Sequence, residues 1–99
     1  METRKLAKIM KALSNEKRLS LFMEIASREE SSFESHACHI SEVVSMLKIS
    51  APTISHHLKE LVNAELITTE KDGKFLMARI DRHTVGQLHE IFSGLSRSQ

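Results

Sequence analysis

The first third of the chain carries two helical patterns of different character. Apolar residues near the start recur at spacings of three and four, with lysines and arginines between them, which predicts an amphipathic helix. Its apolar positions are Leu6, Ile9, Met10 and Leu13. Residues 19–26 are instead apolar around almost the whole helical circumference, which predicts a helix buried at the centre of the fold. Ser14 precedes this second helix and is expected to cap it.

Two short helices joined by a tight connection are predicted next. Residues 27–39 are polar and lack periodic apolar positions, so we expect a helix end followed by a surface loop, with Arg28–Ser35 as a long loop. The segment from Ile40 to Leu47 returns to helical spacing. A short connection separates it from another helical segment that begins near Ser50. Two helices in this arrangement predict a helix-turn-helix.

The helix that follows Ser50 has an apolar and a polar face. The residues expected to pack inward are Ile54, Leu58, Leu61 and Val62. The opposite arc holds Pro52, His56, Lys59 and Asn63, with Thr53 beside them. A proline in the first turn loses little, because an N–H there has no partner within the helix. The outer face therefore presents hydrogen-bonding groups where a recognition helix meets base edges and phosphates.

Strand patterns replace the helical ones in the last third of the chain. The runs LITTEK and KFLMARI are compatible with strands, and Asp72-Gly73 between them predicts a hairpin with a type I′ turn, which would form a wing. A terminal helix follows, with an apolar stripe at Val85, Leu88, Ile91, Phe92 and Leu95. The predicted fold class is α+β, a winged helix-turn-helix of about five helices and a two-stranded β-hairpin wing. Residues 1–99 are expected to form one domain.

Composition narrows the possible settings of the protein. With 99 residues, 40% hydrophobic and 27% charged, the chain is ordinary for one globular domain. No apolar run approaches the roughly 20 residues of a membrane span, and the N-terminus lacks the pattern of a signal peptide. Cys38 is the single cysteine, so no internal disulfide can form. We therefore expect a cytoplasmic protein without a membrane partner.

Charge is distributed unevenly although the net charge is only +1. Residues 1–18 hold six Lys or Arg against two Glu, whereas residues 24–45 hold five Glu against one Arg. A basic beginning followed by an acidic middle gives the molecule a lopsided electric field. The basic segment at residues 1–18 is compatible both with a solvated surface and with a contact to an anionic partner.

The sequence resembles the ArsR/SmtB-type winged-helix repressors. The resemblance is carried by KALSNEKRLSLFMEI, ISEVVSMLKISAPTISHHLKELVNAELI and TTEKDGKFLMARI, and it covers nearly the whole chain in order. Within it, Ser55-His56-His57-Leu58 forms an S-x-H-L phrase, followed by K-x-L and a wing that contains glycine. The resemblance implies a homodimer built on the first and last helices. Each subunit would place its recognition helix in a major groove of double-stranded DNA. The dimer would bind a palindromic operator in this way and repress transcription.

The candidate DNA-binding residues fall on the recognition helix and the wing. His57 lies at the edge of the apolar arc, so we expect it chiefly to pack and to orient the helix, whereas His56 points outward as the better reader of bases or phosphates. Lys71 and Lys74 on the wing are expected to contact phosphates. The full candidate set is Ser50, Thr53, Ser55, His56, His57, Lys59, Lys71 and Lys74.

Both metal sites that the resemblance implies are incomplete in this sequence. The first would be a cysteine pair in the helix before the recognition helix, where His39 and Ser41 stand instead. The second would begin with D-x-H on the terminal helix, and Asp81-Arg82-His83 matches that half. Gly94 and Arg97 stand where the remaining ligands would follow, and neither side chain can bind a cation. We therefore expect no resident metal cofactor at either site.

A different set of possible ligands remains at His36, Cys38 and His39, three nitrogen or sulfur donors within four residues. A metal or thiol sensor acting through these residues is one alternative, although a lone cysteine beside exposed histidines is the commoner situation. A protein-interaction module is another, because residues 50–80 carry four Lys or Arg against four Asp or Glu. No glycine-rich phosphate loop, H-E-x-x-H motif or nucleophile elbow is present, so we expect no enzyme.

Overall fold

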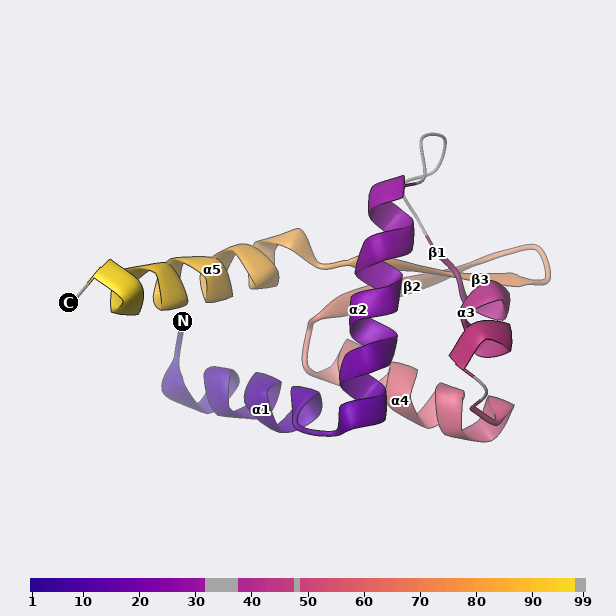
Figure 1. The fold of residues 1–99 in the computed structure, drawn as a ribbon, viewed down its shortest axis with the longest axis horizontal. Coiled ribbons are helices and arrows are strands. Elements are labelled where there is room, and N and C mark those ends of the chain that lie inside the picture. The colour runs from indigo at the N-terminus through magenta and orange to yellow at the C-terminus, as the bar shows by residue number, and fades with distance from the viewer. Residues whose placement is uncertain (32–37, 48, 98–99) are drawn as a thin grey trace.

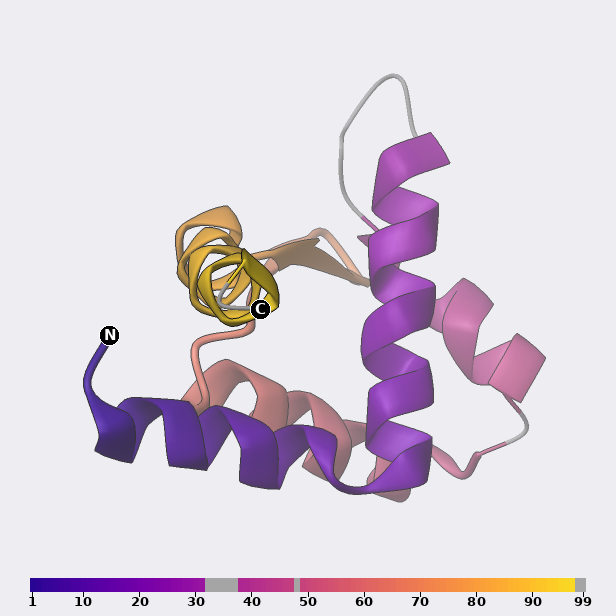
Figure 2. The same ribbon diagram turned by 60° about the vertical axis from the view of Figure 1, so that its left-hand side comes forward.

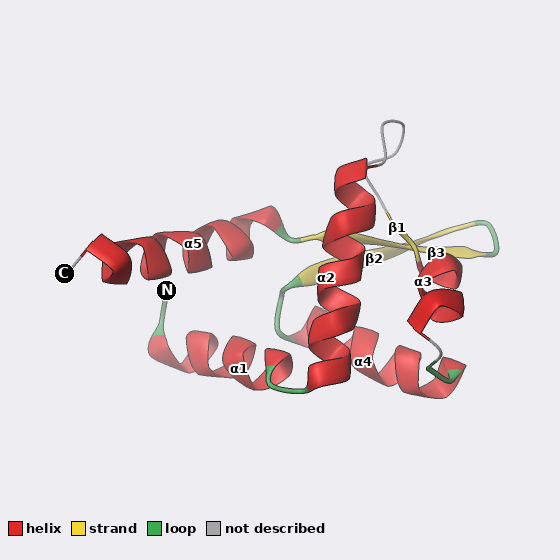
Figure 3. Ribbon diagram, viewed as in Figure 1, coloured by secondary structure: helices red, strands yellow, loops and turns green. Residues whose placement is uncertain are grey.

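The order of helices and strands is that of a winged helix-turn-helix. The computed structural model describes residues 1–31, 38–47 and 49–97. Along these residues the elements are α1 (Thr3–Leu13), α2 (Glu16–Ser31), β1 (Cys38–His39), α3 (Ile40–Leu47), α4 (Ala51–Asn63), β2 (Ile67–Asp72), β3 (Phe75–Ile80) and α5 (Arg82–Arg97). The five helices and the β2–β3 hairpin in this part of the chain confirm the predicted fold class (Figure 3).

Helix α2 lies at the centre of the molecule. It contacts α1, α3, α4, β1 and β3, and Figures 1 and 2 show it standing across the other helices. Leu21 and Ile25 on its inner face are fully buried. The prediction that α2 is buried all round is wrong, since Leu19 and Met23 are 40% and 59% exposed. Neighbouring elements cover only part of its circumference, so two large apolar side chains face outward.

The turn between α1 and α2 corrects the predicted cap. Asn15, not Ser14, caps α2, because its Oδ1 accepts a hydrogen bond from the backbone N–H of Arg18 at 3.0 Å. The Ser14 hydroxyl instead donates to the Lys11 carbonyl at 2.8 Å and so ends α1. With only two residues between the helices, the second of them takes the capping position.

Helix α2 also extends farther than expected. It continues to Ser31, so the first part of the predicted Arg28–Ser35 loop is helical. Arg28 explains this extension, because its guanidinium pairs with Glu24 one turn earlier at 3.1 Å and with Glu42 on α3 at 2.8 Å. Residues 32–37 lie outside the described part of the chain.

A short strand adds to the predicted hairpin. Strand β1 pairs antiparallel with β3, Cys38 opposite Ala78 and His39 opposite Met77, in a sheet of order β1-β3-β2. The sequence did not predict it, since two residues are too few to show the alternation of a strand. This pairing joins the start of the helix-turn-helix directly to the wing.

The hairpin turn lies one residue later than predicted. The strands pair from Ile67–Ile80 to Asp72–Phe75, which leaves Gly73 and Lys74 as the two turn residues. Gly73 has a φ of 62°, a conformation that glycine adopts without steric cost, whereas Lys74 has no positive φ. A type I′ turn needs positive φ at both central residues, so the structure does not form the predicted turn type.

Helices α1 and α5 lie on one side of the molecule, together with both chain ends (Figures 1 and 2). Helix α5 leads away from the sheet, and its apolar stripe is only partly covered within one chain. Phe92 and Leu95 are 50% and 62% exposed, and Met10 on α1 is 39% exposed. This side of the fold therefore presents large apolar side chains to solvent.

Candidate nucleic-acid interface

Helix α4 has the two faces that the sequence predicts, with one correction. Ile54, Leu58 and Leu61 are buried in the core. Val62 is 38% exposed, so its assignment to the inward arc is wrong. It lies at the edge of that arc, beside exposed Asn63, where no neighbouring element covers it fully. Burial of a narrower apolar stripe leaves a broader surface of α4 open.

The outer face of α4 brings together the predicted polar residues of its first half. Thr53, Ser55, His56 and Lys59 are all exposed. Ser50 occupies the N-cap position with extended backbone, but its hydroxyl donates to the Thr53 Oγ1 at 2.8 Å rather than capping a backbone N–H. This bond fixes the Thr53 hydroxyl at the beginning of the helix. The surface that results offers hydroxyl, imidazole and ammonium groups within about two helical turns.

The end of α4 is fixed by its connection to the wing. Glu65 has a φ of 61°, a left-handed conformation usually taken by glycine. Its N–H donates to the Val62 carbonyl at 2.9 Å, and the N–H of Leu66 donates to the Leu61 carbonyl at 3.0 Å, which together form a Schellman motif. Glu65 also pairs with Lys5 of α1 at 2.7 Å. The backbone bonds of this turn thereby set the angle between recognition helix and wing, and the exposed ion pair places α1 beside the turn.

His57 is buried, as expected for a packing residue, with 5% of its surface exposed. The Nε of Arg18 donates to its Nδ1 at 3.3 Å, and the Nη1 of Arg18 donates to the Ala12 carbonyl at 3.2 Å. Arg18 therefore joins α2 to both α1 and α4. Among the candidate DNA-binding residues, His57 is the one whose side chain does not lie at the surface.

The pKa of His57 is lowered from its ordinary value of 6.5. Burial is the largest cause, and the positive charges of Arg18, His56 and Lys17 act in the same direction. Only an unprotonated Nδ1 can accept the bond from Arg18, so the neutral ring with its proton on Nε2 is the form that joins the helices. Sequence reasoning missed Arg18, because the bond joins residues 39 positions apart.

The wing carries the two predicted lysines on its exposed surface. The Nζ of Lys74 lies 5.6 Å from the centre of the Phe75 ring, a distance that allows a cation–π contact. Within the described side chains, neither Lys71 nor Lys74 forms an ion pair with a carboxylate. Both charges are therefore available to an anionic partner.

The candidate metal ligands are only partly covered by the structure. His36 lies outside the described residues, and Cys38 and His39 are placed as backbone in β1 without described side chains. No group of three or more His, Cys, Asp or Glu that could hold a metal occurs among the described residues. Asp81 has a structural task in any case, because its Oδ1 accepts a hydrogen bond from the Thr84 N–H at 3.1 Å and so caps α5.

Known proteins are similar to this chain in both sequence and fold. The family model described as bacterial regulatory protein, arsR family, matches residues 32–69. An arsenical resistance operon repressor from Staphylococcus xylosus is 32% identical over 90 residues, which are 91% of this chain and 79% of the repressor. The chain belongs to the ArsR family. A second arsenical resistance operon repressor, from Staphylococcus aureus, is 40% identical over 73 residues, and the match covers 74% of this ArsR-family chain but only 62% of that repressor.

Solved structures agree on the winged helix-turn-helix fold of this ArsR-family chain. The solution structure of a homodimeric winged helix-turn-helix DNA-binding domain from Mycobacterium bovis, a possible ArsR-family transcriptional regulator, aligns with a TM-score of 0.69 at 19% identity. The alignment covers 97% of this chain and 82% of that domain. HlyU from Vibrio cholerae aligns with a TM-score of 0.67 at 22% identity over 94% of this chain and 99% of its own. Within the described residues, no helix is long and apolar enough to span a membrane.

The lowered pKa of His57 predicts that this ArsR-family chain loses stability as the pH falls below about 6.5. Unfolding restores an ordinary pKa near 6.5, so between that pH and the lower pKa of the folded state the unfolded chain binds more protons. The free energy of unfolding therefore decreases as the solution is acidified through this interval. His57→Gln removes the titrating ring and should show a shallower decrease. Urea unfolding of both proteins between pH 7.5 and 5 measures the difference, and parallel curves would contradict the account.

Proposed function

We propose that this ArsR-family chain is a homodimeric transcriptional repressor that binds a palindromic operator in double-stranded DNA. The observation that carries the proposal is the exposed face of α4, where Thr53, Ser55, His56 and Lys59 lie together. The opposite face of the same helix is held in the core. A helix fixed on one side and polar on the other can enter a major groove and offer the same side chains to each site it meets.

The proposed roles of the residues follow from what each side chain can reach. Thr53, Ser55, His56 and Lys59 would contact base edges and phosphates in the groove, and Ser50 would orient Thr53 through its hydroxyl. His57 would hold the helix in place from inside. Lys71 and Lys74 would contact phosphates beside the groove, because the hairpin extends away from the body of the protein (Figure 1).

Repression is supported by the names of the relatives, since two staphylococcal proteins with 32% and 40% identity are arsenical resistance operon repressors. We propose no arsenical response for this chain, because His39 and Ser41 stand where the resemblance places a cysteine pair. We place this regulator with its operator in the cytoplasm, and the proposal assigns it no catalytic role.

Dimerisation is proposed through α1 and α5. Met10, Phe92 and Leu95 are large apolar side chains on these two helices and are 39–62% exposed in the single chain. Exposed large apolar side chains that gather on one side of a soluble protein are a common mark of a protein–protein interface. The Mycobacterium bovis domain of the same fold is homodimeric. A two-fold dimer would present two recognition helices to two half-sites of one operator.

Substitutions in α4 and in the wing should have different effects on DNA binding. The operator is first selected from a random DNA pool with the wild-type chain. His56→Ala and Thr53→Ala should reduce discrimination at particular base pairs by about 1–3 kcal/mol. Lys71→Ala and Lys74→Ala should weaken operator and random DNA alike, and each should lower the slope of log affinity against log salt by about 1.

Titrations of each variant with operator and with random DNA at several salt concentrations give both quantities. Equal losses of affinity for operator and random DNA in all four variants would contradict the division into residues that contact bases and residues that contact phosphates. Failure of the wild-type chain to select any sequence would overturn the proposed function and favour a protein-interaction module.

A charge on α5 should separate the two subunits. Leu95→Asp places a carboxylate on the proposed interface, where it would lose its hydration on dimerisation. Sedimentation equilibrium should show dimers for the wild type and monomers for Leu95→Asp at micromolar concentration. Met23→Asp is the matched control, because Met23 is similarly exposed at 59% against 62% for Leu95, but belongs to α2, outside the two helices of the proposed interface. Retention of the dimer by Leu95→Asp would contradict the proposed interface.

A further inference from the structure

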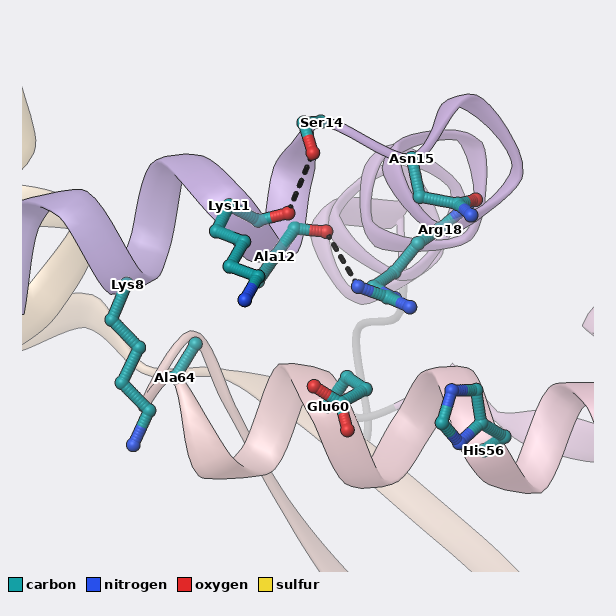
Figure 4. A pocket seen from close by; sticks show the side chains of 9 residues that line it. All are labelled: Lys8, Lys11, Ala12, Ser14, Asn15, Arg18, His56, Glu60 and Ala64. Carbon is teal, nitrogen blue, oxygen red and sulfur yellow. Dashed lines mark hydrogen bonds between the residues drawn. The ribbon is translucent and has the colours of Figure 1, made fainter.

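A basic groove runs between α1, the start of α2 and α4, and it adjoins the face of α4 assigned to base reading. Its volume is about 520 Å³. Lys8 and Lys11 of α1, Arg18 of α2, and His56 and Glu60 of α4 supply its charged and titratable lining. Figure 4 shows the two lysine side chains extending from α1 toward α4, with Glu60 and His56 on the side of α4 that faces them. The lining thus contains three permanent positive charges and one carboxylate.

The positive charges in this groove are not neutralised by the protein. Lys8 and Lys11 form no ion pair with any described carboxylate, whereas Lys5 on the same helix is paired with Glu65 at 2.7 Å. The hydrogen bonds of the Arg18 side chain go to two neutral acceptors, the Ala12 carbonyl and the His57 ring.

These two bonds leave Arg18 charged and rigidly held. They engage two of the five N–H donors of the guanidinium, and the others bond to no residue in the described part of the chain. A planar guanidinium fixed in this way is suited to recognise a phosphate, because its remaining donors keep one orientation.

The lining favours a phosphate of DNA over a small organic ligand. Pockets for small molecules are mostly lined by hydrophobic and aromatic side chains, but the only hydrophobic residues among those that line this groove are Ala12 and Ala64. His56 belongs both to the groove and to the outer face of α4. A DNA strand whose bases meet that face therefore carries its backbone past the mouth of the groove.

We propose that Lys8, Lys11 and Arg18 bind a backbone phosphate of the DNA strand that α4 reads, an assignment that rests on the proposed function. This contact assigns a role to part of the basic segment at residues 1–18. Phosphate contacts fix the register and orientation of a protein on the duplex without reading sequence. The groove would therefore set the angle at which α4 enters the major groove. Because Arg18 also donates a hydrogen bond to His57, the same side chain would hold α4 in place and bind the DNA phosphate.

The test measures how DNA affinity depends on salt. Lys8→Gln/Lys11→Gln should weaken binding to operator and to random DNA by the same factor, roughly tenfold at physiological salt, and lower the salt slope by about 1 to 2. Glu60→Gln should tighten binding to both DNAs, because it removes the one carboxylate from the groove. Lys8 and Lys11 are exposed, so their replacement leaves the core intact, and Glu60→Gln tests the groove by an independent change.

Lys5→Gln is the matched control, since it removes one lysine from the same helix but outside the groove. It should change the salt slope by less than half as much per charge as the double variant. An unchanged slope in Lys8→Gln/Lys11→Gln, an equal effect per charge in Lys5→Gln, or no tightening in Glu60→Gln would overturn the proposal. In each case, selective operator binding by the wild-type chain would show that the proposed function itself still holds.

Inorganic phosphate distinguishes the two sources of such an anion. If the groove holds a DNA phosphate, millimolar inorganic phosphate should lower the DNA affinity of the wild type more than that of Lys8→Gln/Lys11→Gln at constant ionic strength. If phosphate binds the groove of the free protein, seen by NMR, while the double variant binds DNA like the wild type, the groove belongs to a small anion and the proposal is wrong.

Discussion

The hydrogen bonds of Arg18 connect the three helices on which the rest of the structure depends. They run from α2 to the Ala12 carbonyl at the end of α1 and to the buried His57 ring of α4. Both acceptors are neutral, so the guanidinium positions the helices without losing its charge. In a chain of 99 residues with a modest core, one side chain that fixes three elements constrains the fold strongly.

This arrangement couples the interior of the protein to its basic surface. Protonation of His57 would remove the acceptor of the Arg18 bond and place a second positive charge beside the guanidinium. The consequence would be felt at the outer face of α4, one residue away at His56, and in the groove that Arg18 lines. Stability, the position of the recognition helix and affinity for phosphate therefore depend on the same contact.

Periodicity predicted most of the fold, because helices and hairpins of ordinary length are local structures. It also separated His56 from His57, since adjacent residues lie about 100° apart around a helix and one of them had to face the core. Features that depend on distant partners were missed or wrong. Strand β1 exists only through its pairing with β3, and the exposure of Met23 depends on which neighbours cover α2.

The candidate site divides in the same way. The polar face of α4 could be read from its own sequence, whereas the groove beside it combines side chains from three helices and has no sequence motif. Lys8 belonged to a basic segment whose partner the sequence left open. The ion pair of Lys5 with Glu65, which sets it apart from Lys8, became visible only when α1 was placed against the end of α4.

The central claim is that α4 enters DNA with its outer face while its inner face stays fixed by the core and by Arg18. Backbone amide NMR spectra of the labelled dimer, recorded with and without its selected operator, test this claim most directly. The account predicts that the largest shift changes occur in residues 50–59 and in the β2–β3 hairpin, with further changes around Lys8, Lys11 and Arg18. Spectra in which residues 50–59 stay unchanged while another surface responds to the operator would contradict it.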